Sequence, residues 1–273
     1  MNIFVCPVCR RELEDCGSLY KCGGGHCFDK SKFGYVNLLQ SQKSSSKRHG
    51  DDRLMVRARR DFLDSGGYSF LLDALCEISM RLIGGGAVLD AGCGECYYSS
   101  GIKKKLLESG INAEFFGVDI SKDALEFASK RKSGIKTAVA SLFDLPVADE
   151  SCRAVLNVFS PQADSEFRRV LKKDGILIRV IPLEKHLFEL KSVIYDEPYK
   201  NEVPSAEAEG FSLIEETHLR RKLILDSSEE TENLFKMTPY YYKTGRDDQL
   251  KISGLDRLET RAEFGIRVYR KEG

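Results

Sequence analysis

Four residues near the amino terminus have the types and the spacing of a metal site. They form two pairs, with two residues inside the first pair, three inside the second and twelve between the pairs: Cys6, Cys9, Cys22 and His26. Zinc accepts thiolate and imidazole ligands in one tetrahedral site, so the pairs predict a closed structural zinc site. Cys16 and Cys27 are alternative ligands for the fourth position. A set of unconnected free thiols is the competing interpretation.

A second chemical pattern lies between Val88 and Tyr97, where an apolar run leads into a turn of small residues. Gly92 and Gly94 allow the backbone to come close to a ligand, and the first turn of a following helix offers unpaired amide groups. A dinucleotide site would have glycine at position 97. The Asp-x-Gly-x-Gly order that starts at Asp90 is typical of methyltransferases instead.

A carboxylate at the end of the next apolar run strengthens this interpretation. Asp119 ends the run 115–119, at the place where a ribose diol would need an acceptor for its two hydroxyls. An acidic residue after a strand can also be a helix cap, a role that Ser121 could serve instead. Together, the turn and Asp119 predict a site for a nucleoside-containing ligand.

The elements that must position these residues alternate along the chain. From residue 87, short apolar runs and amphipathic segments follow one another, which indicates parallel strands joined by helical crossovers. The two last apolar runs flank a helix and indicate an antiparallel pair. The predicted strands are 87–91, 115–119, 137–140, 154–159, 176–182, 211–225 and 263–270. The predicted fold is α/β, a class I Rossmann-like domain with a mostly parallel seven-stranded sheet.

Composition divides the chain into three parts. Residues 1–38 are rich in cysteine and glycine and too few to bury a core without a metal. The stretch QSQKSSSKRHGDD contains no apolar residue and is typical of a linker. We therefore predict a zinc-binding module at 1–38, a linker at 39–53 and a Rossmann-like domain at 54–273 that begins with two helices.

Charge and composition limit the classes of function. The chain has no net charge, but residues 1–60 hold 12 Lys and Arg against 6 Asp and Glu. This excess favours a polyanionic partner such as nucleic acid, and a solvated basic face is the alternative interpretation. No apolar run reaches the roughly 18 residues that cross a membrane, and the amino terminus lacks a secretory signal. We therefore expect a cytoplasmic protein with reduced thiols.

Several blocks, in order along nearly the whole chain, resemble one family. The blocks are CPVCRREL, CGGGHCFDKSKFGYVNLL, RARRDFLDSGGY, LDAGCGECYYS, HLFELKSVIYDEP and MTPYYYK. They are similar to those of the bacterial large-subunit (23S) ribosomal RNA guanine-N1 methyltransferases of the zinc-containing type, the RlmA family. The block FDKSKFGYVNLL, beside a zinc site and upstream of a methyltransferase turn, is highly specific.

The resemblance implies roles for particular residues, beginning with zinc held by the two pairs. Residues that it implies for S-adenosylmethionine are Tyr68, Asp90, Gly92, Gly94, Cys96, Tyr97, Asp119 and His186. Tyr68 would cover the cofactor and His186 would approach its methionine carboxylate, although each would otherwise be assigned to the core. Cys96 stands where the family usually has Gly, so the approach of the backbone to a ligand is slightly restricted there, and we expect cofactor binding to survive if Cys96 avoids positive φ.

The implied substrate is a guanine in a hairpin of 23S ribosomal RNA, methylated at N1. That nitrogen must lose its proton and be aligned with the methyl group. Asn157 is a candidate to bond the base edge, and no residue is identifiable as the proton acceptor. The tyrosines Tyr240, Tyr241 and Tyr242 are candidates for stacking on the exposed base, unless they fill a strand edge. Predicted phosphate contacts, beside the zinc module, are Lys43, Lys47, Arg48, Arg57, Arg59 and Arg60.

Two other classes of function stay open at this point. One is a small-molecule methyltransferase of the same fold, against which the cysteine pairs and the basic amino-terminal part count. The other is a non-catalytic RNA-binding or ribosome-assembly protein, against which the intact glycine and acidic positions count. The sequence does not identify the chosen guanine or a role in antibiotic response. A homodimer, with one hairpin in a cleft between subunits, is a hypothesis that no residue tests.

Overall fold

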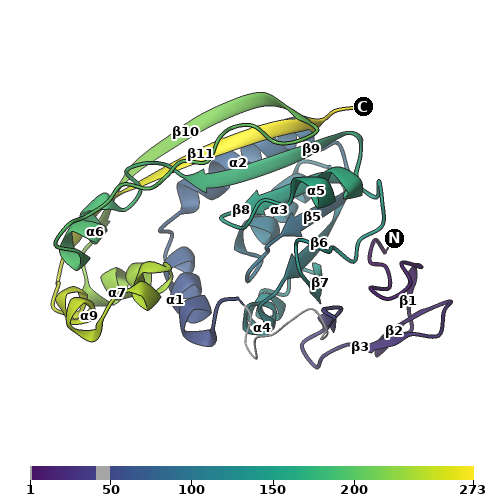
Figure 1. The fold of residues 1–273 in the computed structure, drawn as a ribbon, viewed down its shortest axis with the longest axis horizontal. Coiled ribbons are helices and arrows are strands. Elements are labelled where there is room, and N and C mark those ends of the chain that lie inside the picture. The colour runs from purple at the N-terminus through teal and green to yellow at the C-terminus, as the bar shows by residue number, and fades with distance from the viewer. Residues whose placement is uncertain (1, 41–49) are drawn as a thin grey trace.

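The computed structural model describes residues 2–40 and 50–273, and one large sheet forms its centre (Figure 1). The strands of this sheet are β4 Val36–Asn37, β5 Gly86–Ala91, β6 Ala113–Asp119, β7 Lys136–Val139, β8 Cys152–Val158, β9 Leu171–Pro182, β10 Phe211–Leu225 and β11 Leu258–Lys271. Their order is β10-β11-β9-β8-β5-β6-β7-β4. Strands β4 to β9 pair in parallel, whereas β11 is antiparallel to both β9 and β10.

The seven predicted strands, β5 to β11, are confirmed, and the eighth comes from the amino-terminal segment. β4 pairs with β7, and Val36 lies opposite Ala138. A strand of two residues is too short to show the alternation by which strands are recognised in a sequence. The amino-terminal segment therefore contributes an edge strand to the large sheet, while the three-part division of the chain stays a prediction.

The predicted helices also occur, in the order expected. They are α1 Arg53–Asp64, α2 Ser69–Leu82, α3 Tyr97–Glu108, α4 Lys122–Lys130, α5 Asp164–Val170, α6 Phe188–Ile194 and α7 Ser228–Lys236. Two further helices, α8 Tyr240–Lys243 and α9 Arg246–Ser253, were not predicted. The three adjacent tyrosines form the short helix α8 and are not an edge strand. In Figure 1, α6, α7 and α9 lie together at one end of the molecule. Within the described ranges, no helix is both long and apolar enough to cross a membrane.

Both faces of the large sheet are buried, and the strand sequences explain why. In β5, Val88 belongs to the core on the face covered by α2 and α3, whereas its neighbour Leu89 belongs to the core on the opposite face. Successive side chains of a strand point to opposite faces, so a strand covered on both sides needs a continuous apolar run. On the second face, Ile3 and Phe4 supply part of the cover. The Phe4 ring packs edge-on against Phe116, with centroids 5.6 Å apart.

The order of the strands reverses at β5. From this strand the chain adds β6 and β7 on one side and later places β8 and β9 on the other. Ligands of open α/β sheets bind outside the carboxyl ends of the strands at such a switch point. The glycine-rich turn after Ala91, the carboxylate of Asp119 and the segment after Val158 all lie at this edge.

Candidate functional site

The predicted zinc ligands lie together in a small sheet at the amino terminus. Its strands are β1 Leu13–Asp15, β2 Leu19–Cys22 and β3 Cys27–Asp29. The four ligand atoms of Cys6, Cys9, Cys22 and His26 lie within 4.8 Å of one another, and the Sγ atoms of Cys9 and Cys22 are 3.6 Å apart. Bonds of about 2.3 Å at a tetrahedral angle separate sulfur atoms by about 3.8 Å, so the cluster fits zinc. The alternative cysteines at positions 16 and 27 are exposed.

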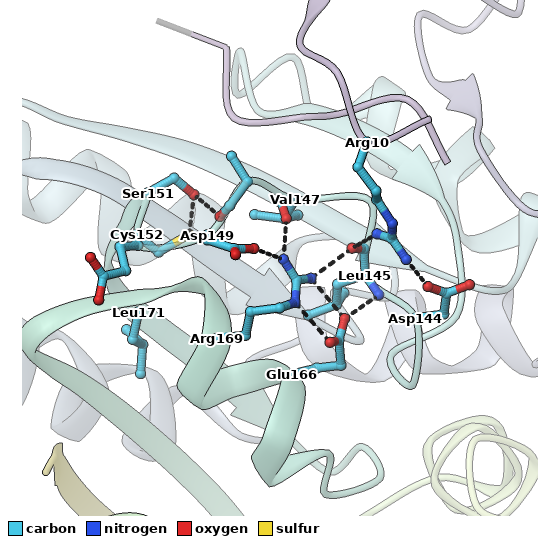
Figure 2. Close-up of polar contacts among 12 residues, drawn as sticks. Arg10, Asp144, Leu145, Val147, Asp149, Ser151, Cys152, Glu166, Arg169 and Leu171 are labelled. Atoms are coloured by element: carbon cyan, nitrogen blue, oxygen red, sulfur yellow. Dashed lines mark hydrogen bonds and ion pairs between the residues drawn. The ribbon is translucent and has the colours of Figure 1, made fainter. Parts of the chain in front are cut away.

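Arg10 is one of the residues that join the zinc-binding turn to the large domain (Figure 2). Arg10 forms an ion pair with Asp144 and donates Nη1 to the carbonyl of Leu145 at 2.8 Å. The same carbonyl accepts from Nη2 of Arg169 at 2.9 Å, and Glu166 accepts from the Leu145 amide at 2.6 Å. A short stretch of the β7–β8 connection therefore joins the zinc-binding turn to α5.

The glycine-rich turn follows β5 at the switch point. Gly92 has a φ of +85°, and a Cβ atom here would collide with Ser160. Gly94 donates its amide to Oδ2 of Asp119 at 2.8 Å, and the Ser121 amide donates to Oδ1 at 2.8 Å. Ser121 is also the residue that caps α4 with its hydroxyl. Asp119 is therefore not the helix cap, and its carboxylate is held beside the turn.

Two carboxylates lie close to this turn. Asp90, in β5, is 3% exposed, and burial raises its pKa to about 7, with the nearby charge of Asp119 adding to the rise. Burial also raises the pKa of Asp119, although the amides of Ser121 and Gly94 lower it. A cationic ligand group would stabilise both ionised carboxylates. The site therefore suits the ammonium and sulfonium groups of S-adenosylmethionine.

Cys96 does not avoid positive φ. Cys96 has a φ of +62° and a ψ of +31°, in the left-handed region, and its amide closes a tight turn with the carbonyl of Cys93 at 2.8 Å. This turn delivers the chain directly into α3, whose first residue is Tyr97. The Cys96 side chain is 1% exposed and packs with apolar residues that include Leu125 and Val139. Cys96 therefore combines a buried side chain with a left-handed backbone, which glycine adopts more easily than cysteine.

The ring of the predicted cofactor residue Tyr68 is buried in the core, and its hydroxyl has no hydrogen-bond partner among the described residues. Tyr68 is 2% exposed, and its ring packs edge-on against Phe62 and Phe264, with centroids 5.0 and 4.9 Å away. Its Oη atom and that of Tyr98 are buried without a hydrogen-bond partner among the described residues. Burial raises the pKa of both phenols, so they stay protonated. Orphaned buried hydroxyls beside a glycine-rich turn are what a polar ligand would satisfy.

His186 lies against the same aromatic group. Its ring centroid is 4.8 Å from that of Phe264 and 6.2 Å from that of Tyr68. The Nδ1 atom accepts from the amide of Glu263 at 3.3 Å. Burial, with a smaller effect of the Lys191 charge, lowers its pKa to about 3. The imidazole is therefore neutral at physiological pH, so it does not supply a positive charge for a carboxylate.

Asn157 is buried at the end of β8. The side chain is fully buried, and Nδ2 donates to the Ser160 hydroxyl at 2.5 Å and to the Pro161 carbonyl at 3.1 Å. The Ser160 hydroxyl in turn donates to the carbonyl of Ala91 at 2.6 Å. Asn157 therefore joins the end of β8 to the end of β5, while its Oδ1 atom has no hydrogen-bond partner among the described residues, so its role toward the base stays a prediction.

Two of the predicted phosphate contacts face the site instead of solvent. Arg60 lies 3.5 Å from the buried carboxylate of Glu95 in the glycine-rich turn, and Arg59 pairs with Asp51. Arg57, on the same helix, is exposed as expected. Positions 59 and 60 share a helical face with the buried residues 56 and 63. This periodicity was the signal in the sequence that the two arginines face inward. The other three predicted contacts, at 43, 47 and 48, lie outside the described residues.

The three adjacent tyrosines have different surroundings. Tyr240 donates its hydroxyl to Oδ1 of Asn201 at 3.3 Å, and Tyr241 packs edge-on against Phe235 with centroids 5.4 Å apart. Tyr242 is 52% exposed. Only the last of the three presents a large free surface, so it is the one that stays a candidate for stacking.

These features define a class of protein. The site fits S-adenosylmethionine through the turn at Gly92, the carboxylates of Asp90 and Asp119, and the unpaired tyrosine hydroxyls. The chain is therefore a methyltransferase with an amino-terminal zinc site. Residues 84–235 match a family model described as a methyltransferase domain, and residues 4–47 match one described as the amino-terminal part of RlmA.

Known proteins agree with this class. A Bacillus subtilis (strain 168) protein, YxjB, provisionally named a 23S rRNA (guanine-N1)-methyltransferase, is 32% identical over 256 residues, 90% of this chain and 89% of that one. The 23S rRNA (guanine(748)-N1)-methyltransferase of Streptomyces fradiae is 36% identical over 189 residues, which cover 68% of this chain and 65% of that enzyme. The chain belongs to the family of 23S rRNA (guanine-N1)-methyltransferases.

Solved structures are more distant. The YcgJ protein of Bacillus subtilis has 16% identity and a TM-score of 0.47 over 74% of this chain and 99% of its own.

Proposed function

We propose that this chain transfers a methyl group from S-adenosylmethionine to N1 of a guanine in a hairpin of 23S ribosomal RNA. The observation that carries the proposal is the docking of the zinc module on the connection that follows β7, through Arg10 and Leu145. A methyltransferase of small molecules has no need of such a module. The names of the two relatives support the same substrate.

The residues of the site have separable tasks in this reaction. S-adenosylmethionine, when bound, supplies an electrophilic methyl group on a sulfonium. Gly94 and Asp119 are placed to hold the ribose, and Asp90 provides a carboxylate that a cationic group would keep ionised. Tyr68 and His186 form a neutral wall, which excludes water without placing a positive charge beside the sulfonium.

The target base is proposed to stack on Phe159. This side chain is 43% exposed at the carboxyl end of β8, and its ring centroid is 5.1 Å from that of Phe264 and 6.4 Å from that of Tyr98. Its φ of +55° is costly for an aromatic residue, and such strain gathers at functional sites. Stacking of a base on an aromatic ring contributes about 1–3 kcal/mol.

Methyl transfer to defined RNAs tests the proposal. The chain is incubated with labelled S-adenosylmethionine and 23S rRNA from a strain that lacks the modification, and product positions are mapped by arrest of reverse transcription. We expect one strong stop within a hairpin, because methylation at N1 blocks Watson–Crick pairing. A matched transcript with adenine in place of that guanine is the control.

Three results would contradict the proposal. Label in both transcripts would mean another target, label only in small molecules would favour a metabolic enzyme, and tight RNA binding without transfer would favour an assembly protein. We further propose action in the cytoplasm, where ribosomal RNA of bacteria is made. The homodimer stays a hypothesis, to be tested by the mass of the particle in solution.

A further inference from the structure

Arg59 lies where three parts of the molecule meet. Its guanidinium pairs with Asp51, and Nη2 donates to the carbonyl of Met237, the residue after α7, at 3.2 Å. Its Nη1 atom is 4.0 Å from the position that a Cβ atom would occupy at Gly94 in the glycine-rich turn. The helix that carries Arg59, α1, packs between α7 and α4 (Figure 1). The cation therefore faces the cofactor turn.

The positive charge of Arg59 acts on three polar groups of the site. Burial raises the pKa of Tyr68, Tyr98 and Asp119, and the guanidinium opposes each of these rises. The hydroxyls of both tyrosines are among the buried polar atoms that have no hydrogen-bond partner in the described part of the chain. Arg59 therefore lies near enough to both hydroxyls for its charge to act on them.

S-adenosylmethionine brings a carboxylate to the site at its amino-acid end. A carboxylate taken from water into a largely buried site needs a cationic partner. His186, which was expected to approach it, is neutral, since burial lowers its pKa to about 3. Two other guanidinium groups lie near the turn and share one carboxylate: Arg131 donates to Glu95 at 2.6 Å, and Arg60 lies 3.5 Å from it. Arg59 is likewise paired, with Asp51, but it is the one that acts on the two tyrosine hydroxyls.

We propose that Arg59 binds the carboxylate of the amino-acid end of S-adenosylmethionine, and that Asp51 holds the guanidinium over the turn. The inference rests on the proposed function only in taking S-adenosylmethionine as the methyl donor. A guanidinium has five N–H donors in a fork, so it serves Asp51, the Met237 carbonyl and a ligand carboxylate together. This role replaces the phosphate contact expected for Arg59.

The exposed fractions of Arg59 and Arg57 distinguish a cofactor contact from a phosphate contact. The Arg59 side chain is 28% exposed, whereas that of Arg57, two residues earlier on α1, is 74% exposed and pairs only loosely with Asp61 at 3.8 Å. A phosphate of a large RNA reaches Arg57 more easily than Arg59. Arg57 is therefore the matched control, since its loss removes the same charge from the same helix without touching the turn.

Calorimetry with two ligands and no RNA tests the inference. S-adenosylhomocysteine carries the carboxylate, whereas 5′-methylthioadenosine keeps the adenosine and the sulfur but lacks the amino-acid end. We expect Arg59→Ala to weaken S-adenosylhomocysteine by about 10- to 100-fold, the effect of one charge-assisted contact, and 5′-methylthioadenosine by less than about threefold. Arg59→Lys should recover part of the loss, and Arg57→Ala should change neither affinity. Thermal unfolding of each variant checks that the fold is kept.

Two outcomes overturn the inference. An equal loss for both ligands would mean that Arg59 only shapes the turn, and unchanged ligand binding with weaker RNA binding would restore the phosphate role. Because no RNA is present, failure of the guanine assay leaves this result intact. If the unaltered chain binds neither ligand, both the cofactor assignment and this inference fall.

Discussion

Replacement of Asp90 by Asn should stabilise the ligand-free protein, and increasingly so at higher pH. Burial raises the pKa of Asp90 from 3.8 to about 7, so the folded protein retains a proton that the unfolded chain loses near pH 4. The carboxyl therefore costs stability as the pH rises from about 4 to about 7, and the cost is complete above that range. A difference of about three pKa units corresponds to roughly 4 kcal/mol.

Urea unfolding of Asp90→Asn and the unaltered chain, each with zinc and without cofactor, measures the effect. The variant should be more stable by up to about 4 kcal/mol at pH 8 and by roughly 2 kcal/mol at pH 5.5. Exchange of the exposed Asp256 for Asn is the control and should have almost no effect at either pH. A stability gain that does not depend on pH would refute the reasoning, because an amide cannot titrate.

The same variant should bind S-adenosylhomocysteine more weakly, since the amide cannot attract the ammonium group of the ligand. If the variant is more stable but binds the ligand more weakly, then Asp90 is retained for binding although it destabilises the fold. If both stability and binding fall, Asp90 is a structural acceptor, and its assignment to the cofactor is wrong.

Three further changes test other parts of the structure. Removal of zinc by a chelator, or Cys9→Ser, should unfold the residues of β1 to β3, as followed by hydrogen exchange, and full protection without metal would exclude a structural zinc. Arg10→Ala should cost about 1 kcal/mol and increase exchange at residues 144–147, whereas Arg11→Ala should not. Cys96→Gly should be more stable than Cys96→Ala by about 1 kcal/mol in thermal unfolding, because both lose the thiol but only glycine relieves the positive φ; equal stabilities would argue against strain.

Local patterns in the sequence were enough to predict most elements and the two ligand sites. The spacing of the cysteine pairs, the turn after Ala91 and the carboxylate of Asp119 each depend on residues that are close in sequence or at the end of a strand. Long apolar runs made the strands evident, because a sheet covered on both faces has no polar alternation to obscure them. The carboxyl-terminal pair was predicted from its place after a doubly wound sheet, since its edge strand β10 is mostly exposed and is not a continuous apolar run.

Features that depend on distant neighbours could not be predicted in this way. The glycine that the family usually has at position 96 was the available signal for a left-handed backbone, whereas the burial of the Cys96 side chain against α4 and β7 had no local signal. Asn157 has the polarity of a site residue, and only the approach of Ser160 and Ala91 shows that it is buried. The helical period did place Arg59 on the inner face of α1, but the charge of an arginine normally indicates solvent.

The edge strand β4 also has a consequence for synthesis of the chain. Val36 pairs with Ala138, so it waits during synthesis for a partner made roughly 100 residues later, and Phe4, which bridges to Val147, waits longer. At about 5–20 residues per second this delay is of the order of 5–20 s. A zinc-loaded amino-terminal sheet, whose own contacts are local, can persist through that interval. It can then cover the open edge of β7 as soon as this strand forms, before the edge pairs with another chain.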